Sequence, residues 1–427
     1  MTDFSAGAFQ SLGINSKAAE RVQAIEKRLI PQFESIEQTK LINQAKVIAA
    51  FRKNRVEYRH FAGSTGYGYG DIGRDLLDRL FADVFHTESA LVRPQIASGT
   101  HALSLCLYAL LGRGSRLVSV TGKPYDTLLE TIGVEKGANG IDSLIDLGVN
   151  YIPVDLLDGR IDLDRAVKIL RESDQPTIAY LQRSRGYDWR PAITMEELGS
   201  VVRVIKAANP SAVVVVDNCY GEFTEDLEPT DAGADLIIGS MIKNPGGGLA
   251  PTGAYVAGNA ALIDRIQYRL TAPGIGMEVG SWPAGYLPFY QGLFLAPHVV
   301  GESLKGATLL SAVMADLGFD VMPTLDAMRS DITQSIRFGS EEKLLQFCRI
   351  VQSASPVDSH VVPEPWPMPG YQNDVVMAAG TFIQGASIEL SADAPIKPPY
   401  IGYWQGGLTF EHCKLAAMML ASDFMMR

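Results

Sequence analysis

An aspartate and a lysine follow two consecutive apolar runs in the middle of the chain. The run from Ala212 ends at Asp217, and the next run leads to Ser240 and Lys243, after which a glycine-rich turn begins. Enzymes that use pyridoxal phosphate (PLP) need such a pair, because a lysine forms an imine with the cofactor aldehyde and an acid keeps the pyridine nitrogen protonated. A free lysine titrates near about 10.4, so we expect burial or a neighbouring cation to stabilise the neutral amine. The spacing predicts a PLP site with Lys243 as its catalytic amine.

Small hydroxyl residues are placed where they can bind a phosphate. Ser98, Gly99 and Thr100 stand at the start of an apolar helix, and the free N–H groups of a helix start attract anions. Ser240 lies three residues before the lysine and can donate to the same phosphate. An ordinary N-cap explains the first group equally well. Tyr125 comes just after a strand and either stacks on a pyridine ring or packs under a helix.

Basic and aromatic residues in the predicted loops are candidates for the remaining contacts. Arg183 and Arg185 follow one strand, and Lys397 follows another near the C-terminus. Each of these side chains either binds a carboxylate or phosphate or is solvated. Arg185 and Lys397 are the two candidates for substrate binding. Tyr67 and Tyr69 lie in a glycine-rich loop, which is either a surface turn or a mobile loop that reaches a ligand.

Several other classes of function fit less well. Gly68, Gly70 and Gly73 have the spacing of a dinucleotide-binding loop, but no hydrophobic strand precedes them. Ser240 and Lys243 match the S-x-x-K element of penicillin-recognising enzymes, whose S-D-N and K-T-G elements are absent. The six histidines and four cysteines form no metal-binding motif, so we expect no metal. A net charge of −11 disfavours nucleic acid, and no apolar run is long enough for a membrane span.

The elements that must position these residues alternate between strands and helices. With 427 residues, 47% hydrophobic and 20% charged, the chain is long enough for more than one domain. Short apolar runs alternate with amphipathic segments from residue 88 to residue 258, which predicts a mostly parallel sheet covered by helices on both faces. We expect an N-terminal helical arm (1–55), a large three-layer α/β/α domain (56–296) and a small α+β domain (297–427). In the small domain, a helix from about Pro297 to Leu317 and strands at ITQSIRF, VVMAAGTF and SIELSAD are expected.

Long segments of the chain resemble one family of PLP enzymes. The segments are SGTHAL, TGKPYDTL, QRSRGY, VDNCYGEF, GSMIKNPGGGLAPTGAYVAG, TAPGIG, QGLFLAP, FIQGASIELSAD and PYIGYWQGGLTFEH. They are similar to the aluminium resistance, or methionine gamma-lyase-like, family, which resembles the cystathionine lyase branch of the aspartate aminotransferase fold. The resemblance covers nearly the whole chain and implies the PLP-dependent transferase fold, fold type I.

The resemblance also implies roles for particular residues. It makes Lys243 the Schiff-base lysine, Asp217 the pyridine partner and Tyr125 the stacking residue, with Ser98, Gly99, Thr100 and Ser240 around the phosphate. It implies a homodimer or homotetramer with a shared active site, in which the Tyr67–Tyr69 loop reaches the neighbouring subunit's phosphate. The chain departs from the better-known lyases in this loop, where GYGYG with Arg74 further on replaces their Tyr-x-Arg element. No arginine of the small domain matches their carboxylate ligand clearly, and Lys397 and Arg337 are candidates.

Four hypotheses follow, of which the first is a cytoplasmic PLP-dependent lyase. It would act on a sulfur-containing amino acid by β- or γ-elimination through the Lys243 Schiff base. The second is another PLP enzyme, such as an aminotransferase, and the third is a nucleotide-binding dehydrogenase that uses Gly68–Gly73. The fourth is a PLP-binding protein without turnover. A scatter of four cysteines without a paired motif indicates reduced thiols in a cytosolic protein.

Overall fold

The structure is a computed structural model that describes residues 3–134, 142–172, 174–368 and 371–425. Its larger part contains a seven-stranded sheet with the order β1-β7-β6-β5-β4-β2-β3. The strands are β1 (Ser89–Arg93), β2 (Arg116–Ser119), β3 (Asn150–Pro153), β4 (Thr177–Gln182), β5 (Val213–Asp217), β6 (Leu236–Ser240) and β7 (Ala254–Gly258). Strands β3, β2, β4, β5 and β6 pair in parallel, and β7 runs antiparallel to both of its neighbours, β6 and β1.

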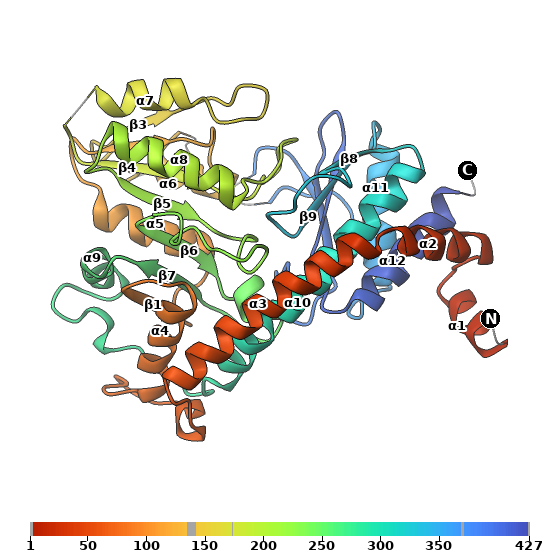
Figure 1. Ribbon diagram of the computed structural model, residues 1–427, viewed down its shortest axis with the longest axis horizontal. Coiled ribbons are helices and arrows are strands. Elements are labelled where there is room, and N and C mark those ends of the chain that lie inside the picture. The colour runs from red at the N-terminus through yellow and green to blue at the C-terminus, as the bar shows by residue number, and fades with distance from the viewer. Residues whose placement is uncertain (1–2, 135–141, 173, 369–370, 426–427) are drawn as a thin grey trace.

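Helices cover both faces of this sheet, as the alternation in the sequence predicts (Figure 1). On one face, Val214 and Val216 of β5 share a core with α4 (Ile72–Val84), α7 (Leu163–Arg171) and α8 (Met195–Ala208). On the other face, Val215 packs in a core with α5 (Gly99–Leu110), α6 (Asp126–Ile132) and α9 (Ala260–Leu270). Successive side chains of one strand therefore enter opposite cores, which explains why these strands are apolar throughout. The predicted three-layer α/β/α architecture is confirmed.

The smaller part contains a five-stranded antiparallel sheet with the order β10-β11-β12-β9-β8. Its elements are β8 (Asp320–Met322), β9 (Thr333–Arg337), α11 (Glu341–Ala354), β10 (Val375–Ala378), β11 (Ser391–Pro395), β12 (Ile401–Gln405) and α12 (Phe410–Phe424). The expected strand SIELSAD begins only at Ser391, because the Glu389 carboxylate accepts hydrogen bonds from the backbone N–H groups of Phe382 and Ile383 and closes a loop there. The α+β character of this part agrees with the prediction.

Two long helices connect the two parts. Helices α1 (Asp3–Ser11), α2 (Ser16–Arg28) and α3 (Ile30–Lys53) form the N-terminal arm, and α3 lies beside α10 (Leu287–Asp316) along the molecule (Figure 1). Helix α10 begins ten residues before the expected start at Pro297, because its buried stripe already includes Phe289 and Leu293. The expected division between residues 296 and 297 therefore falls within one continuous helix. Short 3₁₀ turns occur at Tyr58–Phe61, Asn244–Gly246 and Gly276–Glu278.

Candidate active site

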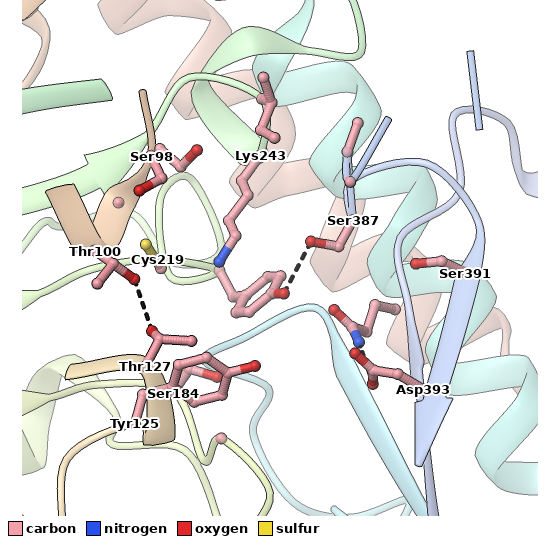
Figure 2. Close-up of a pocket in the computed structure, with 18 of the residues that line it drawn as sticks. Ser98, Thr100, Tyr125, Thr127, Ser184, Cys219, Lys243, Ser387, Ser391 and Asp393 are labelled. Atoms are coloured by element: carbon pink, nitrogen blue, oxygen red, sulfur yellow. Dashed lines mark hydrogen bonds between the residues drawn. The ribbon is translucent and has the colours of Figure 1, made fainter. Parts of the chain in front are cut away.

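Asp217 and Lys243 come together at the carboxyl edge of the large sheet. Asp217 is the last residue of β5, and the parallel neighbour β6 ends at Ser240, three residues before Lys243. Loops after adjacent parallel strands open at the same edge, so both side chains line one cavity of about 270 Å³ (Figure 2). The opposite wall of this cavity comes from the small domain and includes Ser387, Ser391 and Asp393.

Lys243 lies over the ring of Tyr220. Its Nζ is 4.1 Å from the ring centroid, and the Tyr220 hydroxyl is 2.8 Å from Ser387 Oγ. Tyr220 has a φ of 71°, a conformation that a bulky residue adopts only under local constraint. Burial alone would lower the pKa of the lysine, but Cys219, Tyr220 and Asp217 around it raise that pKa above its ordinary value. These acidic groups favour the ammonium, contrary to the expectation that burial or a cation would favour the free amine.

Asp217 is buried and held by two donors. Its Oδ1 accepts from the Cys219 backbone N–H at 3.1 Å, and its Oδ2 accepts from the Tyr180 hydroxyl at 3.4 Å. Burial raises the pKa of Asp217, and the nearby Lys243 partly opposes this effect. The carboxyl is thus fixed at the cavity wall, where it can face a basic ring nitrogen.

The start of α5 forms another part of the wall. Ser98 caps the helix, since its Oγ accepts from the His101 N–H at 3.0 Å, and Thr100 Oγ1 is 2.7 Å from Thr127 Oγ1. A Cβ on Gly99 would stand 3.2 Å from Cys219 Sγ. Glycine therefore keeps the helix start open to the cavity, and Ser240 lies on the same side. The N-cap interpretation of Ser98 is observed, and the phosphate interpretation stays a prediction, because a capping hydroxyl leaves the remaining N–H groups of the first turn available.

Tyr125 lines the cavity as the N-cap residue of α6. Its hydroxyl is 2.7 Å from that of Tyr371, and its ring centroid is 5.8 Å from the Tyr187 ring. Burial raises the pKa of Tyr125 well above its ordinary range. The phenol therefore holds its proton at neutral pH, and either hydroxyl can be the donor in the bond between Tyr125 and Tyr371.

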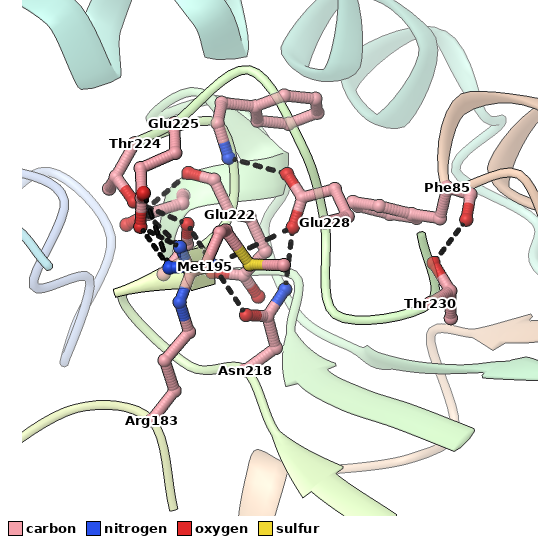
Figure 3. Close-up of polar contacts among 12 residues, drawn as sticks. Phe85, Arg183, Met195, Asn218, Glu222, Thr224, Glu225, Glu228 and Thr230 are labelled. Atoms are coloured by element: carbon pink, nitrogen blue, oxygen red, sulfur yellow. Dashed lines mark hydrogen bonds and ion pairs between the residues drawn. The ribbon is translucent and has the colours of Figure 1, made fainter. Parts of the chain in front are cut away.

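The two arginines after β4 do not line this cavity. Arg183 is fully buried, with Nη2 2.8 Å from Glu225 Oε1 and Nη1 donating to Asn218 Oδ1 at 3.0 Å and to the Gly221 carbonyl at 2.9 Å (Figure 3). It holds the loop after Asp217 in place. Arg185 is equally buried and pairs with Asp331 of the small domain. The structure thus gives both side chains partners within the protein, in place of the predicted ligand.

Other predicted contacts lie outside the cavity. Lys397 is exposed in the loop after β11, and Arg337 lies 4.3 Å over the Trp189 ring and pairs with Asp320. Tyr67 and Tyr69 are 70% and 69% exposed. Their ring centroids are 5.4 Å apart, so the loop presents an aromatic pair to its surroundings.

Several lining residues were not identified from the sequence. Tyr220, Tyr371, Ser387, Ser391, Asp393 and Gln405 all border the cavity. Asp393 had a signal that was not used, because it is an acid between Ala392 and Ala394, on the same face of the strand as Ser391 two residues earlier. Tyr220 lies in the loop after β5, and the position of the remaining residues, which belong to the small domain, follows from tertiary packing and has no local pattern.

The residues that are present fit PLP. Asp217 ends one strand, Lys243 follows the end of its neighbour by three residues, and both line the cavity. Gly99 leaves the helix start open, and Tyr125 offers a flat ring in the same cavity. Among the described residues, no cluster of three or more metal-binding side chains occurs. Within the same residues, none of the helices has the length and apolar character that crossing a membrane requires.

Comparisons with known proteins support this assignment. The sequence model of the methionine gamma-lyase family matches residues 18–425. The uncharacterized protein YnbB of Bacillus subtilis is 49% identical over 412 residues, which cover 96% of each chain. A crystal structure from Clostridium novyi, described as a carbon–sulfur lyase involved in aluminium resistance, has 48% identity and a TM-score of 0.94 over 99% of both chains. The PLP-dependent protein YhfS of Escherichia coli is 17% identical with a TM-score of 0.58 over 91% of this chain and 96% of its own, a likeness of fold alone.

Proposed function

Because the chain belongs to the methionine gamma-lyase family, we propose that it is a PLP-dependent lyase that cleaves a carbon–sulfur bond of an amino acid. The expected resemblance and fold type I are confirmed by the family match and the structural neighbours. The observation that carries the proposal is the meeting of Lys243 and Asp217 at adjacent strand ends, in one cavity with the start of α5. The position of β- or γ-elimination stays open.

Each part of the cavity has a task in this proposal. Lys243, Asp217 and Tyr125 would hold the PLP ring, and Ser98, Gly99, Thr100 and Ser240 would hold its phosphate. Bound PLP supplies an electron sink for the negative charge that develops at the substrate Cα. Lys243 is the amine available to move the Cα proton. The Tyr125 phenol, which shares a hydrogen bond with Tyr371, keeps a proton that it can donate to the departing sulfur.

We also propose that the enzyme is a homodimer or homotetramer with a shared active site. The exposed Tyr67–Tyr69 pair supports this proposal, because an aromatic loop without cover in one chain suits contact with a neighbouring copy. The cysteines at 106, 219, 348 and 413 are buried and free, which suits the reducing cytoplasm.

A spectrum of the purified protein before and after borohydride tests the cofactor assignment. We expect an imine absorbance band that borohydride removes, with the reduced cofactor mapped by mass spectrometry to Lys243. Lys243→Ala should abolish the label, whereas Lys397→Ala should keep it, since Lys397 lies exposed outside the cavity. Labelling at another lysine would contradict the assignment.

A panel of sulfur-containing amino acids then tests the reaction. We expect release of a thiol together with pyruvate or 2-oxobutyrate. Conversion of the cofactor to its amine form by an amino acid alone would favour an aminotransferase. Nicotinamide nucleotide binding that persists in Lys243→Ala would favour the dehydrogenase hypothesis.

A further inference from the structure

The cavity has an unusual distribution of charge for an amino-acid site. Among its lining residues in the described part of the chain, Lys243 is the sole lysine or arginine, whereas two aspartates are present. Asp217 belongs to the cofactor side. Asp393, on β11 of the small domain, belongs to the opposite wall (Figure 2). This wall therefore offers negative charge to whatever part of a substrate reaches it.

Hydrogen-bond acceptors gather around Asp393. Ser391 lies two residues earlier on the same face of β11, and it pairs across the sheet with Gln405 of β12. Gln405 donates its Nε2 to Asp393 Oδ1 at 2.7 Å, which turns its Oε1 away from the carboxylate. This Oε1 and Ser391 Oγ are both buried and have no hydrogen-bond partner. A buried polar atom without a partner is costly, and both residues line the cavity, so a ligand bound there can supply the partners.

Three aromatic rings gather beside Asp393, and two of them, Tyr125 and Tyr371, line the cavity. Tyr187 donates its hydroxyl to Asp393 Oδ2 at 3.0 Å, and its ring centroid lies 5.8 Å from the rings of both Tyr125 and Tyr371. Burial raises the pKa of Asp393 to about 6, while the hydrogen bonds from Tyr187 and Gln405 oppose this rise. At neutral pH the carboxylate is therefore predominantly ionised, beside rings whose faces attract cations.

We propose that Ser391, Asp393 and Gln405 form a subsite for a protonated amine at the end of the substrate's side chain. An ammonium carries three N–H donors and a positive charge, which match the two unpaired acceptors and the carboxylate. A carboxylate in this place would lie against the Asp393 carboxylate and the Gln405 Oε1 acceptor, while Lys243, the one lysine or arginine among the described lining residues, belongs to the cofactor side. For elimination at Cβ, the substrate class is then an S-substituted cysteine whose substituent ends in an ammonium group, an assignment that rests on the proposed lyase function.

Binding to the holoenzyme tests the subsite without turnover. Three probes share a side chain of the same methylene length and lack sulfur: lysine ends in an ammonium, 2-aminoheptanoate in a methyl group and 2-aminopimelate in a carboxylate. Titration followed by the cofactor absorbance gives each dissociation constant. We expect lysine to bind at least about tenfold more tightly than 2-aminoheptanoate, because the net free energy of one hydrogen bond to a charged group changes an affinity by about this factor.

Two variants connect this preference to the wall. Asp393→Asn keeps the size of the side chain and removes its charge, so the ratio of the two affinities should fall to near one. Ser391→Ala deletes a hydroxyl that has no partner, so it should fold normally and reduce the ratio by a few-fold. Equal binding of lysine and 2-aminoheptanoate to the unmodified enzyme, tighter binding of 2-aminopimelate, or a lysine preference that survives both substitutions would overturn the subsite.

Turnover separates the subsite from the lyase function. S-(2-aminoethyl)cysteine and S-propylcysteine differ only in a terminal ammonium or methyl group. Faster thiol release from the first, dependent on Asp393, supports both proposals. A lysine preference without thiol release from either compound would support the subsite and contradict a lyase that eliminates at Cβ. Equal thiol release from both, with equal binding of lysine and 2-aminoheptanoate, would overturn the subsite alone.

Discussion

Substitution of Arg185 tests whether this residue binds substrate, as the sequence suggested, or joins the two domains, as the structure indicates. Its guanidinium makes two hydrogen bonds to Asp331, Nη2 to Oδ1 at 3.1 Å and Nε to Oδ2 at 3.2 Å, and Nη1 donates to the Met322 carbonyl at 2.7 Å. The side chains of Arg185 and Asp331 are 1% and 0% exposed. Arg185→Met would leave the Asp331 charge buried without its cation.

The expected loss can be estimated from that burial. Removing one partner of a buried ion pair costs about 3–5 kcal/mol, because the remaining charge is desolvated and uncompensated. Asp331→Asn should cost a similar amount. The double variant Arg185→Met/Asp331→Asn should lose less than the sum of the two, since no unpaired charge remains. Arg337→Met is the matched control, because its pair with Asp320 is 35% and 69% exposed and contributes at most about 1 kcal/mol.

Urea midpoints of the four variants and Michaelis constants for a cleaved substrate are the measurements. A structural pair predicts a lower midpoint for both single variants, partial recovery in the double variant and little change in Arg337→Met. A large rise in KM for Arg185→Met, with an unchanged midpoint and an additive double variant, would refute this reasoning. Arg185 would then be assigned to substrate binding.

Three further outcomes follow from Glu222, Asp393 and Gly99. Burial raises the pKa of Glu222 to about 8, so between pH 4.5 and 8 the folded chain keeps a proton that the unfolded chain releases. Glu222→Gln should therefore be more stable than the unmodified protein by about 3 kcal/mol at pH 7. Thermal midpoints measured against pH should show this gain disappear as the pH falls to about 4.5. Lys243, Tyr187 and Tyr371 around Asp393 keep their protons to higher pH, so Asp393 is the group that gains a proton as the pH falls through about 6. The preference for lysine should decline over this range, and the same absorbance titration measures it. Gly99→Val should weaken PLP retention at least about tenfold, measured by dialysis, while Gly112→Val, with open space around it, should not.

Much of the large domain could be predicted because its evidence is local. Parallel strands buried on both faces produce continuous apolar runs, and the residue that ends each run lies at the same sheet edge. Asp217 and Lys243 were therefore recognisable as a pair, and the structure places them in one cavity. The start of α5 was recognisable from Ser98 and Gly99 for the same reason, since caps are read from a few adjacent residues.

The small-domain wall could not be predicted in this way. Its antiparallel strands are short, and β12 supplies Gln405 only through pairing with β11 across the sheet. Arg185 was assigned to the substrate because its loop follows a strand at the active edge, but its side chain turns to Asp331, which lies 146 positions later in the chain. A buried partner of this kind has no signature near the arginine in the sequence.

The two walls of the cavity come from different domains, so the specificity of this enzyme can change separately from its cofactor site. The groups assigned to the cofactor come from loops of the large sheet, whereas the acceptors assigned to the substrate's far end come from β11 and β12. These strands lie outside the elements that hold Lys243 and Asp217, so substitutions at Ser391 or Gln405 can change the charge of the far wall while those elements keep their packing. The position of that wall relative to Lys243 depends on contacts between the domains, among which the Arg185–Asp331 pair is fully buried. Weakening this pair should therefore reduce the preference for lysine over 2-aminoheptanoate before it removes the cofactor, because Lys243 and Asp217 both follow strands of the large sheet.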